Sequence, residues 1–317
     1  MGFRIFEAVF FCDLELYLVL NTTLPPRPQS ELPHLGTYVR EMAVSVERMY
    51  ENALDWAHLP HLHASSFSAI ELLGAEKDAW RARVWNPPPR QDVSSVIELR
   101  LDRVCRRWIT RTLEGANSGN EVWTHCIPLA ARRLIVVVDF FALAVAAAAR
   151  ARTGEAYATL YARLYDEDER MMLMRQTELD HRDAVHQATR QNAAINLGQA
   201  AALLARLPLD VTVGGERYRV ALSDTPADHR ADNRAESTGD VAAANAVVQH
   251  ICAYALTCPH TLGPLEDEPI EAGQVICPWH GYRFDVHTGQ CMEPATEECR
   301  LPVLTVITDE NGDALLI

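Results

Sequence analysis

Hydrophobic and polar residues alternate over several stretches of the first 141 residues, and a period of two is typical of half-buried β-strands. One stretch differs. Residues 38–58 have helical spacing and few helix-breaking residues, which predicts a helix. The expected strands, rich in β-branched and aromatic residues, lie within 3–20 and at 81–85, 93–101, 107–112, 121–127 and 133–141.

The composition changes after residue 154. Residues 155–207 are rich in Ala, Leu, Met, Gln, Arg and Glu, so a long helix is predicted that ends before Pro208. Its methionines Met171, Met172 and Met174 are expected to pack in a core. An antiparallel sheet followed by a long helix predicts an α+β domain.

Shorter elements are expected after Pro208. Gly214 and Gly215 lie between two β-like runs over 211–222, which is a hairpin signal. Residues 223–246 are polar, acidic and rich in turn formers, so a long loop is predicted there. The remaining residues form short β-like runs separated by Gly and Pro.

Charge divides the chain in the same place. The 317 residues carry a net charge of −14, and residues 208–317 contain 18 acidic residues against 6 arginines. Length and this shift predict two domains, over 1–207 and 208–317. The acidic balance argues against binding to nucleic acid and against docking on an anionic membrane.

No targeting or membrane segment is expected. The first residues lack the basic start of a signal peptide. The longest apolar run, 134–149, spans 16 residues and contains Asp139, whereas a membrane helix needs about 20. We therefore expect a cytoplasmic protein.

Two short motifs in the second half combine thiols with imidazoles. Cys258 and His260 form the first motif, and Cys277 and His280 the second, each between β-like runs. Such a set of ligands indicates a metal centre. Zinc would take all four in one tetrahedron. A Rieske [2Fe–2S] cluster would take two cysteines on one iron and two histidines on the other.

The wider context favours the cluster. The run CPHTLG, followed by CPWHGYRFDVHTGQC, is similar to Rieske ferredoxins and to the Rieske domains of ring-hydroxylating oxygenases. This resemblance implies an all-β domain in which Cys258, His260, Cys277 and His280 hold a [2Fe–2S] cluster. Respiratory Rieske proteins carry an extra cysteine in each loop, and here those positions hold Gly263 and Trp279.

A second candidate metal site lies in residues 51–67, where histidines stand near a carboxylate. His58 and His61 are three residues apart and would share a face of a regular helix. His63 would point elsewhere unless the helix deforms, and Pro60 could deform it. Spacing alone favours His61.

Resemblance to a known family favours His63 instead. The pattern Asn52-x2-Asp55-x2-His58-x4-His63 resembles the iron-binding helix of Rieske non-haem iron oxygenase α subunits. It implies that His58 and His63 bind Fe(II) and that Asn52 lies near the iron. It also implies that Asp55 bridges by a hydrogen bond to a Rieske histidine of a neighbouring subunit.

The third iron ligand is expected far downstream. Residues 165–176 are similar to the Glu-Asp-x7-Gln segment of the monooxygenase and demethylase branch of that family, which implies Asp168. Asp166 and Glu167 are the alternatives.

The resemblance implies a helix-grip, START-like catalytic domain joined to a Rieske domain. Such an oxygenase component uses O2, and a reductase or ferredoxin supplies its electrons from NAD(P)H. It would hydroxylate or oxidatively dealkylate a small, largely apolar or aromatic substrate, as a homotrimer. The alternative is a Rieske ferredoxin-like electron carrier fused to an inactive ligand-binding domain. In the familiar oxygenases the Rieske domain comes first, whereas here it comes last, so electron transfer within or between subunits stays open.

Overall fold

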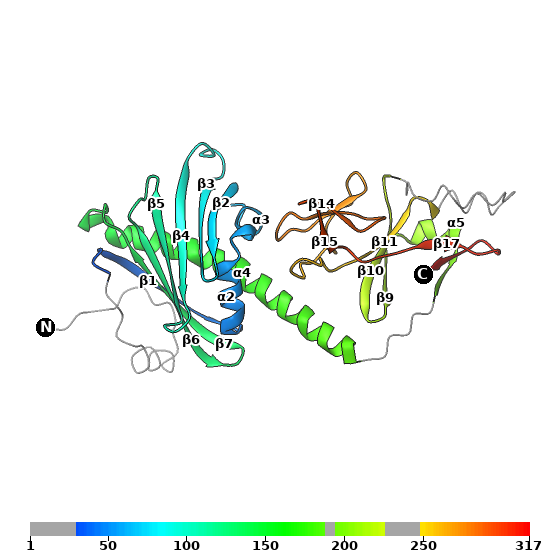
Figure 1. The fold of residues 1–317 in the computed structure, drawn as a ribbon, viewed down its shortest axis with the longest axis horizontal. Coiled ribbons are helices and arrows are strands. Elements are labelled where there is room, and N and C mark those ends of the chain that lie inside the picture. Colours follow the sequence, from blue (N-terminus) through cyan, green and yellow to red (C-terminus); the bar gives the residue numbers. More distant parts are fainter. Residues whose placement is uncertain (1–29, 188–193, 226–247) are drawn as a thin grey trace.

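The computed structural model describes residues 30–187, 194–225 and 248–317. A large sheet with helices lies at one end of the molecule, and a group of small sheets lies at the other (Figure 1). The strands predicted within 3–20 and most of the loop predicted at 223–246 fall outside the described residues.

The large sheet has seven antiparallel strands in the order β1-β7-β6-β5-β4-β3-β2. Most of β7 is buried, as its run of valines predicts. The strands predicted between 81 and 141 are all present. The bounds are β1 His34–Met42, β2 Ala69–Glu76, β3 Ala79–Trp85, β4 Ser94–Asp102, β5 Arg107–Glu114, β6 Glu121–Ala130 and β7 Arg133–Phe141.

Short helices connect β1 to β2, and the helix predicted at 38–58 began too early. Tyr38 and the residues up to Met42 belong to β1, because β7 offers them a strand to pair with. The helix starts only after Ser45, whose hydroxyl accepts from the Arg48 N–H at 3.3 Å and caps it. The helices are α2 Val46–Leu54, the 3₁₀ turn η1 Trp56–His58 and α3 Leu59–Leu62.

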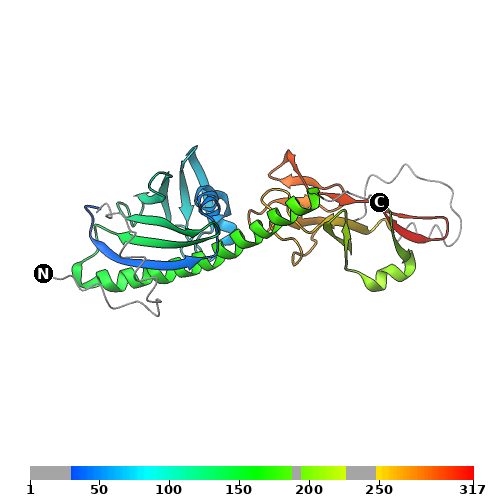
Figure 2. The ribbon, with the colours of Figure 1, turned by 90° about the horizontal axis from the view of Figure 1, so that it is seen from below.

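One long helix, α4 Arg150–Gln187, joins the two ends of the molecule. After the 3₁₀ turn η2 Ala147–Ala149, it runs along the large sheet and continues to the small sheets (Figure 2). It passes so close to β1 that a methyl group on Gly154 would overlap the carbonyl oxygen of Leu35. Tyr165 and Met172 of α4 are buried in the core between helix and sheet. A long helix held against an antiparallel sheet is the helix-grip arrangement.

The helix predicted at 155–207 was too long at its C-terminal end. Residues Ile195–Gln199 form strand β8, which pairs with β18 Asp313–Leu316 near the other end of the chain. Local composition favours helix here, but Gly198, at φ 87°, does not fit a right-handed helix, and the distant partner strand favours β pairing. The helix α5 Ala200–Leu203 and the 3₁₀ turn η3 Leu204–Arg206 follow.

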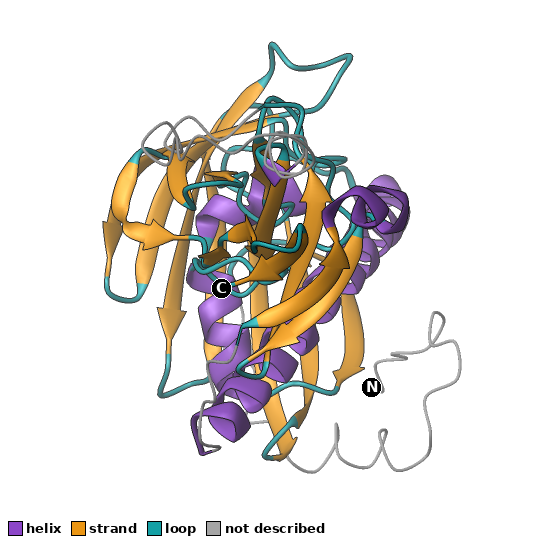
Figure 3. Cartoon of the chain, turned by 90° about the vertical axis from the view of Figure 1, so that its right-hand side faces the viewer, coloured by secondary structure: helices purple, strands orange, loops and turns teal. Residues whose placement is uncertain are grey.

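Strands dominate the second half (Figure 3), and its described residues form three small sheets. The predicted hairpin is present, with Gly214 and Gly215 between β9 and β10. The sheet orders are β16-β11-β10-β9, β12-β13-β14-β15 and β17-β18-β8. Their further strands are β9 Leu209–Val213, β10 Glu216–Leu222, β11 Ile251–Ala255, β12 Gln274–Ile276, β13 Arg283–Asp285, β14 Gln290–Glu293, β15 Thr296–Arg300, β16 Val303–Leu304 and β17 Val306–Thr308.

The two halves are packed together. Met171 and Met174 of α4 and Leu62 of α3 join an apolar cluster of the second half. Strand β8 and helix α5 also pack with the small sheets, although they precede the boundary predicted at 207/208, which stays a prediction. Within the described residues, no helix combines the length and the apolar character that a membrane span requires.

Candidate metal centres

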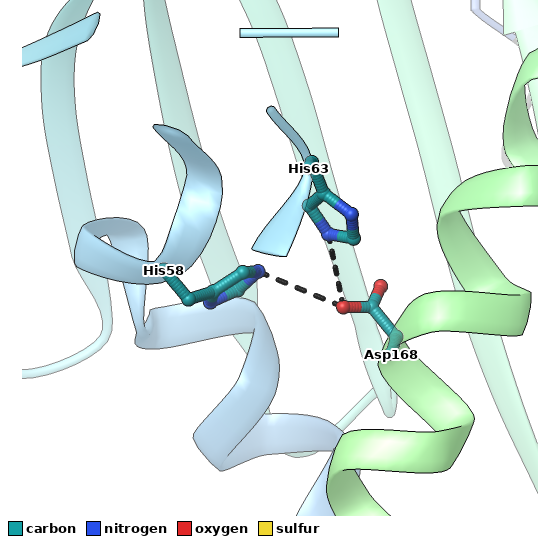
Figure 4. Close-up of side chains that lie close together, drawn as sticks. All are labelled: His58, His63 and Asp168. Carbon is teal, nitrogen blue, oxygen red and sulfur yellow. Dashed lines mark hydrogen bonds and ion pairs between the residues drawn. The ribbon is translucent and has the colours of Figure 1, made fainter. Parts of the chain in front are cut away.

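Three buried side chains that could bind one metal ion come together from distant parts of the sequence (Figure 4). His58 ends η1, His63 directly follows α3, and Asp168 lies in the middle of α4. Each offers one donor atom, and the three atoms lie within 4.8 Å of one another. Oδ1 of Asp168 is 3.0 Å from Nε2 of His63 and 3.6 Å from Nε2 of His58.

A break in the helix brings His58 and His63 together. Helix α2 stops at Leu54, the chain makes the 3₁₀ turn that ends at His58, and α3 restarts with Pro60 in its first turn. The two imidazole rings then lie 5.1 Å apart. His61 is exposed and instead faces Gly281 in the second half. The structure therefore groups His63, and not His61, with the other two residues.

Neighbouring side chains hold this cluster in place. The indole N–H of Trp80 in β3 donates to the carbonyl oxygen of Ala53 at 2.9 Å and fixes the end of α2 on the sheet. The amide of Asn52, expected near the iron, donates to Asp168 Oδ1 at 2.9 Å. Asn52 thus fixes the orientation of the carboxylate.

Glu167 and Asp166, the alternatives to Asp168, have other contacts. Glu167 Oε2 lies 2.6 Å from Nδ1 of His63, on the side of the ring that faces away from Asp168. Asp166 is exposed and pairs with Arg40 at 2.6 Å. Sequence reasoning considered Glu167 only as a rival ligand and missed its contact with His63. In the sequence, only the position of Glu167 directly before Asp168 pointed to this contact.

The electrostatic surroundings of His58, His63 and Asp168 favour a bound cation. Burial works against charge on Asp168, but hydrogen bonds from His63 and Asn52 and the nearby His58 lower its pKa overall. Burial also disfavours a charged His63, yet Asp168 and Glu167 raise its pKa. Nδ1 of His58 is buried and has no hydrogen-bond partner among the residues that the structure describes. Two imidazoles and a carboxylate form the donor set of a non-haem Fe(II) site, so the residues fit that metal.

The second candidate centre lies on two loops of the same shape. In the first loop, the N–H of Cys258 donates to the carbonyl oxygen of Gly263. In the second loop, the N–H of Cys277 donates to the carbonyl oxygen of Tyr282. Both hydrogen bonds are 2.8 Å long, and each acceptor lies five residues after its donor. Gly263 permits the close approach, because an added methyl group would lie 2.8 Å from the sulfur of Cys277. The loops thus present one thiol and one imidazole each.

The four side chains of these loops are close together. The two thiols are fully buried, and their interaction with each other raises the pKa of Cys258 and lowers that of Cys277. The rings of His260 and His280 lie 4.7 Å apart. No described cysteine forms a disulfide, so both thiols can bind a metal. Two thiols and two imidazoles fit a Rieske cluster.

One carboxylate connects the two candidate centres. Oδ2 of Asp55 lies 2.7 Å from Nε2 of His280 and 3.7 Å from Nδ1 of His58. Burial would raise the pKa of Asp55, but its contacts with His280 and His58 lower it well below the usual range. The resemblance implied a histidine of a neighbouring subunit here. In this structure, the histidine belongs to the same chain.

Comparison with known proteins identifies the second half. Residues 207–306 match the family model of the Rieske [2Fe-2S] domain, and the match includes all four residues of the two loops. The chain therefore carries a Rieske [2Fe–2S] domain towards its C-terminus, which implies a Rieske [2Fe–2S] cluster. No curated protein matches the sequence.

Solved structures resemble the N-terminal half in fold. Norcoclaurine synthase from Thalictrum flavum is 15% identical, over 46% of this chain and 98% of its own, with a TM-score of 0.37. The ZhuI aromatase/cyclase from a Streptomyces species is 16% identical, over 50% of this chain and 100% of its own, with a TM-score of 0.35. A START superfamily protein from Mycobacterium smegmatis is 16% identical, over 43% and 91%, with a TM-score of 0.31. The sheet and helix of the chain itself give an α+β fold, in which a helix-grip part is followed by a Rieske domain.

Proposed function

We propose that this protein is the oxygenase component of a Rieske non-haem iron system. The observation that carries the proposal is the buried cluster of His58, His63 and Asp168, joined through Asp55 to a histidine of the Rieske domain. A protein that only carries electrons would not need a second group of metal-binding side chains next to its [2Fe–2S] cluster. A site that activates O2 needs both an open-sided metal and a supply of electrons.

The residues of the chain would divide the work as follows. His58, His63 and Asp168 would hold Fe(II), which supplies the binding and reduction of O2. Asn52 orients the Asp168 carboxylate, and Glu167 orients the His63 ring. The group of His58, His63 and Asp168 is buried, with His63 only 2% exposed, which would keep bulk water away from a bound metal.

The substrate proposed is a small, largely apolar or aromatic molecule, which is hydroxylated or oxidatively dealkylated. Support comes from the surroundings of Asp168. Tyr161 and Tyr165, on the same helix, are held in an apolar core, and burial raises the pKa of both phenols. Apolar surroundings with few polar groups are typical of sites for such ligands. Electrons are proposed to come from NAD(P)H through a reductase, a ferredoxin or both.

Counting iron tests this proposal. A chain with both centres should hold about three irons, and one with only the cluster about two. His58→Ala and Asp168→Ala should each remove about one iron and leave the amount of [2Fe–2S] cluster, measured as the integrated EPR intensity of the reduced cluster, unchanged. Cys258→Ala should remove the visible colour of the cluster. Asp166→Ala is the matched control, because this neighbouring carboxylate pairs with Arg40 and should not affect the iron count.

Turnover gives the second part of the test. Oxygen uptake, assayed with a panel of small apolar and aromatic compounds, should depend on both His58 and Asp168. Turnover that survives both substitutions would contradict the proposed iron site. About two irons in the wild-type chain would support the electron carrier instead.

A further inference from the structure

We infer that each chain contains the complete connection between its own two metal centres, so that electrons pass between them without crossing to a second subunit. This inference rests on the proposed function and adds the route by which electrons pass between the two centres. Each transfer moves one electron, drawn from the external reductase and delivered in the end to O2.

The route consists of three side chains of one chain. Nε2 of His280 and Oδ2 of Asp55 are at hydrogen-bond distance, 2.7 Å, and the same oxygen lies 3.7 Å from Nδ1 of His58, which is ion-pair but not hydrogen-bond distance. His280 turns its other nitrogen, Nδ1, to the first cluster loop, where the Thr261 hydroxyl lies at 3.2 Å. His58 likewise turns Nε2 towards Asp168. Each histidine therefore keeps one nitrogen for a metal and directs the other at Asp55.

Side chains on one face of α4 contact both candidate metal centres and keep them in their relative positions. Asp168, Met171, Arg175 and Glu178 are spaced by three or four residues and so lie on one side of the helix. Asp168 belongs to the mononuclear cluster, and Met171 is buried in the core of the Rieske half. A single rigid helix thus supports the iron site and contacts the Rieske domain.

Arg175 fastens the cluster loop to the helical segment that carries Asp55. Its Nη1 donates to the carbonyl oxygen of Thr261 at 2.8 Å, and its Nε donates to Glu51 of α2 at 3.2 Å. Glu51 lies one turn before Asp55, whose N–H donates to the Glu51 carbonyl at 3.0 Å. Arg175 is therefore a positioning residue for the contact between Asp55 and His280.

A close backbone contact completes the interface. Gly281, which follows His280, has φ 68°, and a methyl group there would overlap the ring of His61. His61 thus lies directly against the second cluster loop. Apolar, charged and backbone contacts within one chain therefore hold the two halves together. These contacts place the two candidate metal centres side by side.

Magnetic relaxation of the cluster measures how near the two centres are. With Fe(II) in the mononuclear site, the EPR signal of the reduced cluster should relax faster than with diamagnetic Zn(II) there. The effect falls steeply with distance, so it reports only on neighbouring centres. The wild-type chain is expected to show it, and His58→Ala is expected to lose it.

A mixed complex distinguishes routes within and between chains. Cys258→Ala chains, which lack the cluster, and His58→Ala chains, which lack the iron, are coexpressed with different tags, and complexes with both tags are purified. We expect either no such complex or one without the Fe(II)-dependent relaxation. Wild-type relaxation in the mixed complex, or its absence from the wild-type protein with both centres filled, would overturn the inference. A wild-type chain with about two irons would instead remove the proposed function itself.

Discussion

Glu167 controls how His63 faces the mononuclear site. Its carboxylate lies 2.6 Å from Nδ1, which leaves Nε2 directed at Asp168. Carboxylates that orient a ligating histidine typically contribute about 10–100-fold to metal affinity. Glu167 is therefore part of the site although it is not expected to bind the metal.

Glu167→Ala is predicted to weaken Fe(II) binding by about 10–100-fold and to leave the Rieske spectrum unchanged. Competition with a ferrous chelator measures the affinity. Glu167→Gln should lose less, because its amide oxygen can still accept from the ring. Asp166→Ala is the control on the neighbouring, exposed position. Equal affinities for Glu167→Ala and the wild type would show that this contact does not position the ligand.

Sequence alone could not choose between His61 and His63. Regular helical spacing favoured His61, because it assumes an unbroken helix from Asn52 onward. The helix breaks at Asp55. His61 lies against Gly281, which is more than 200 residues away in sequence. Neither event is visible in local spacing, and only the family resemblance pointed to His63.

At the scale of elements, the crossing of α4 over β1 depends on Gly154. A methyl group there would overlap the backbone of Leu35, which cannot move aside as a side chain can. Gly154→Ala is predicted to lower the free energy of unfolding by about 1–3 kcal/mol through overpacking, more than the helical gain of about 1 kcal/mol. Urea denaturation measures the change.

Gly74→Ala in β2 is the matched control, since an added methyl group meets nothing within 4 Å there. It should leave the free energy of unfolding nearly unchanged. If Gly154→Ala proved as stable as the wild type, α4 would have to lie farther from β1 than the structure places it.

The contact between α4 and the cluster loop can be weakened separately. Arg175→Ala removes the donors to Thr261 and Glu51 and is predicted to reduce the Fe(II)-dependent relaxation of the cluster while both metals stay bound. Arg132→Ala, which breaks an exposed ion pair with Asp180 on the same helix, is the control. Relaxation equal to that of the wild type in Arg175→Ala would mean that Arg175 does not position the loop.

Local patterns predicted the elements unevenly. Strands β3 to β6 were predictable because their residues alternate, as in a sheet with one buried face, and β7 was predictable because it is apolar and β-branched. Residues 38–42 and 195–199 were assigned to helices, yet both pair with strands distant in sequence. Composition cannot show a partner that only the folded chain provides.

At the scale of the whole molecule, charge is concentrated on the Rieske half. Residues 208–317 hold 18 acidic residues and 6 arginines. We predict that the reductase presents a basic surface, so the rate of cluster reduction should fall as salt rises from about 0.01 to 1 M. Stopped-flow absorbance measures this rate, with reduction by an uncharged dye as the control. A rate independent of salt would argue against electrostatic steering.

The order of the domains was readable from the sequence, but their mutual placement was not. The motifs pointed to both sets of candidate ligands and to Asp55 as the proposed link. They gave no sign that Met171, Arg175 and Leu62 would bind the Rieske half to its own chain. The predicted homotrimer remains a prediction, and a link within the chain removes the reason for requiring one.

The central claim is that one chain holds an iron site and a Rieske cluster joined by Asp55. The most direct test is a crystal structure of the iron-loaded protein with an anomalous map at the iron edge. The map should show one iron between His58, His63 and Asp168, a pair of irons at the Rieske loops, and Asp55 against His280 of the same chain. Absence of the single iron, or a bridge from Asp55 to another chain's histidine, would contradict the account.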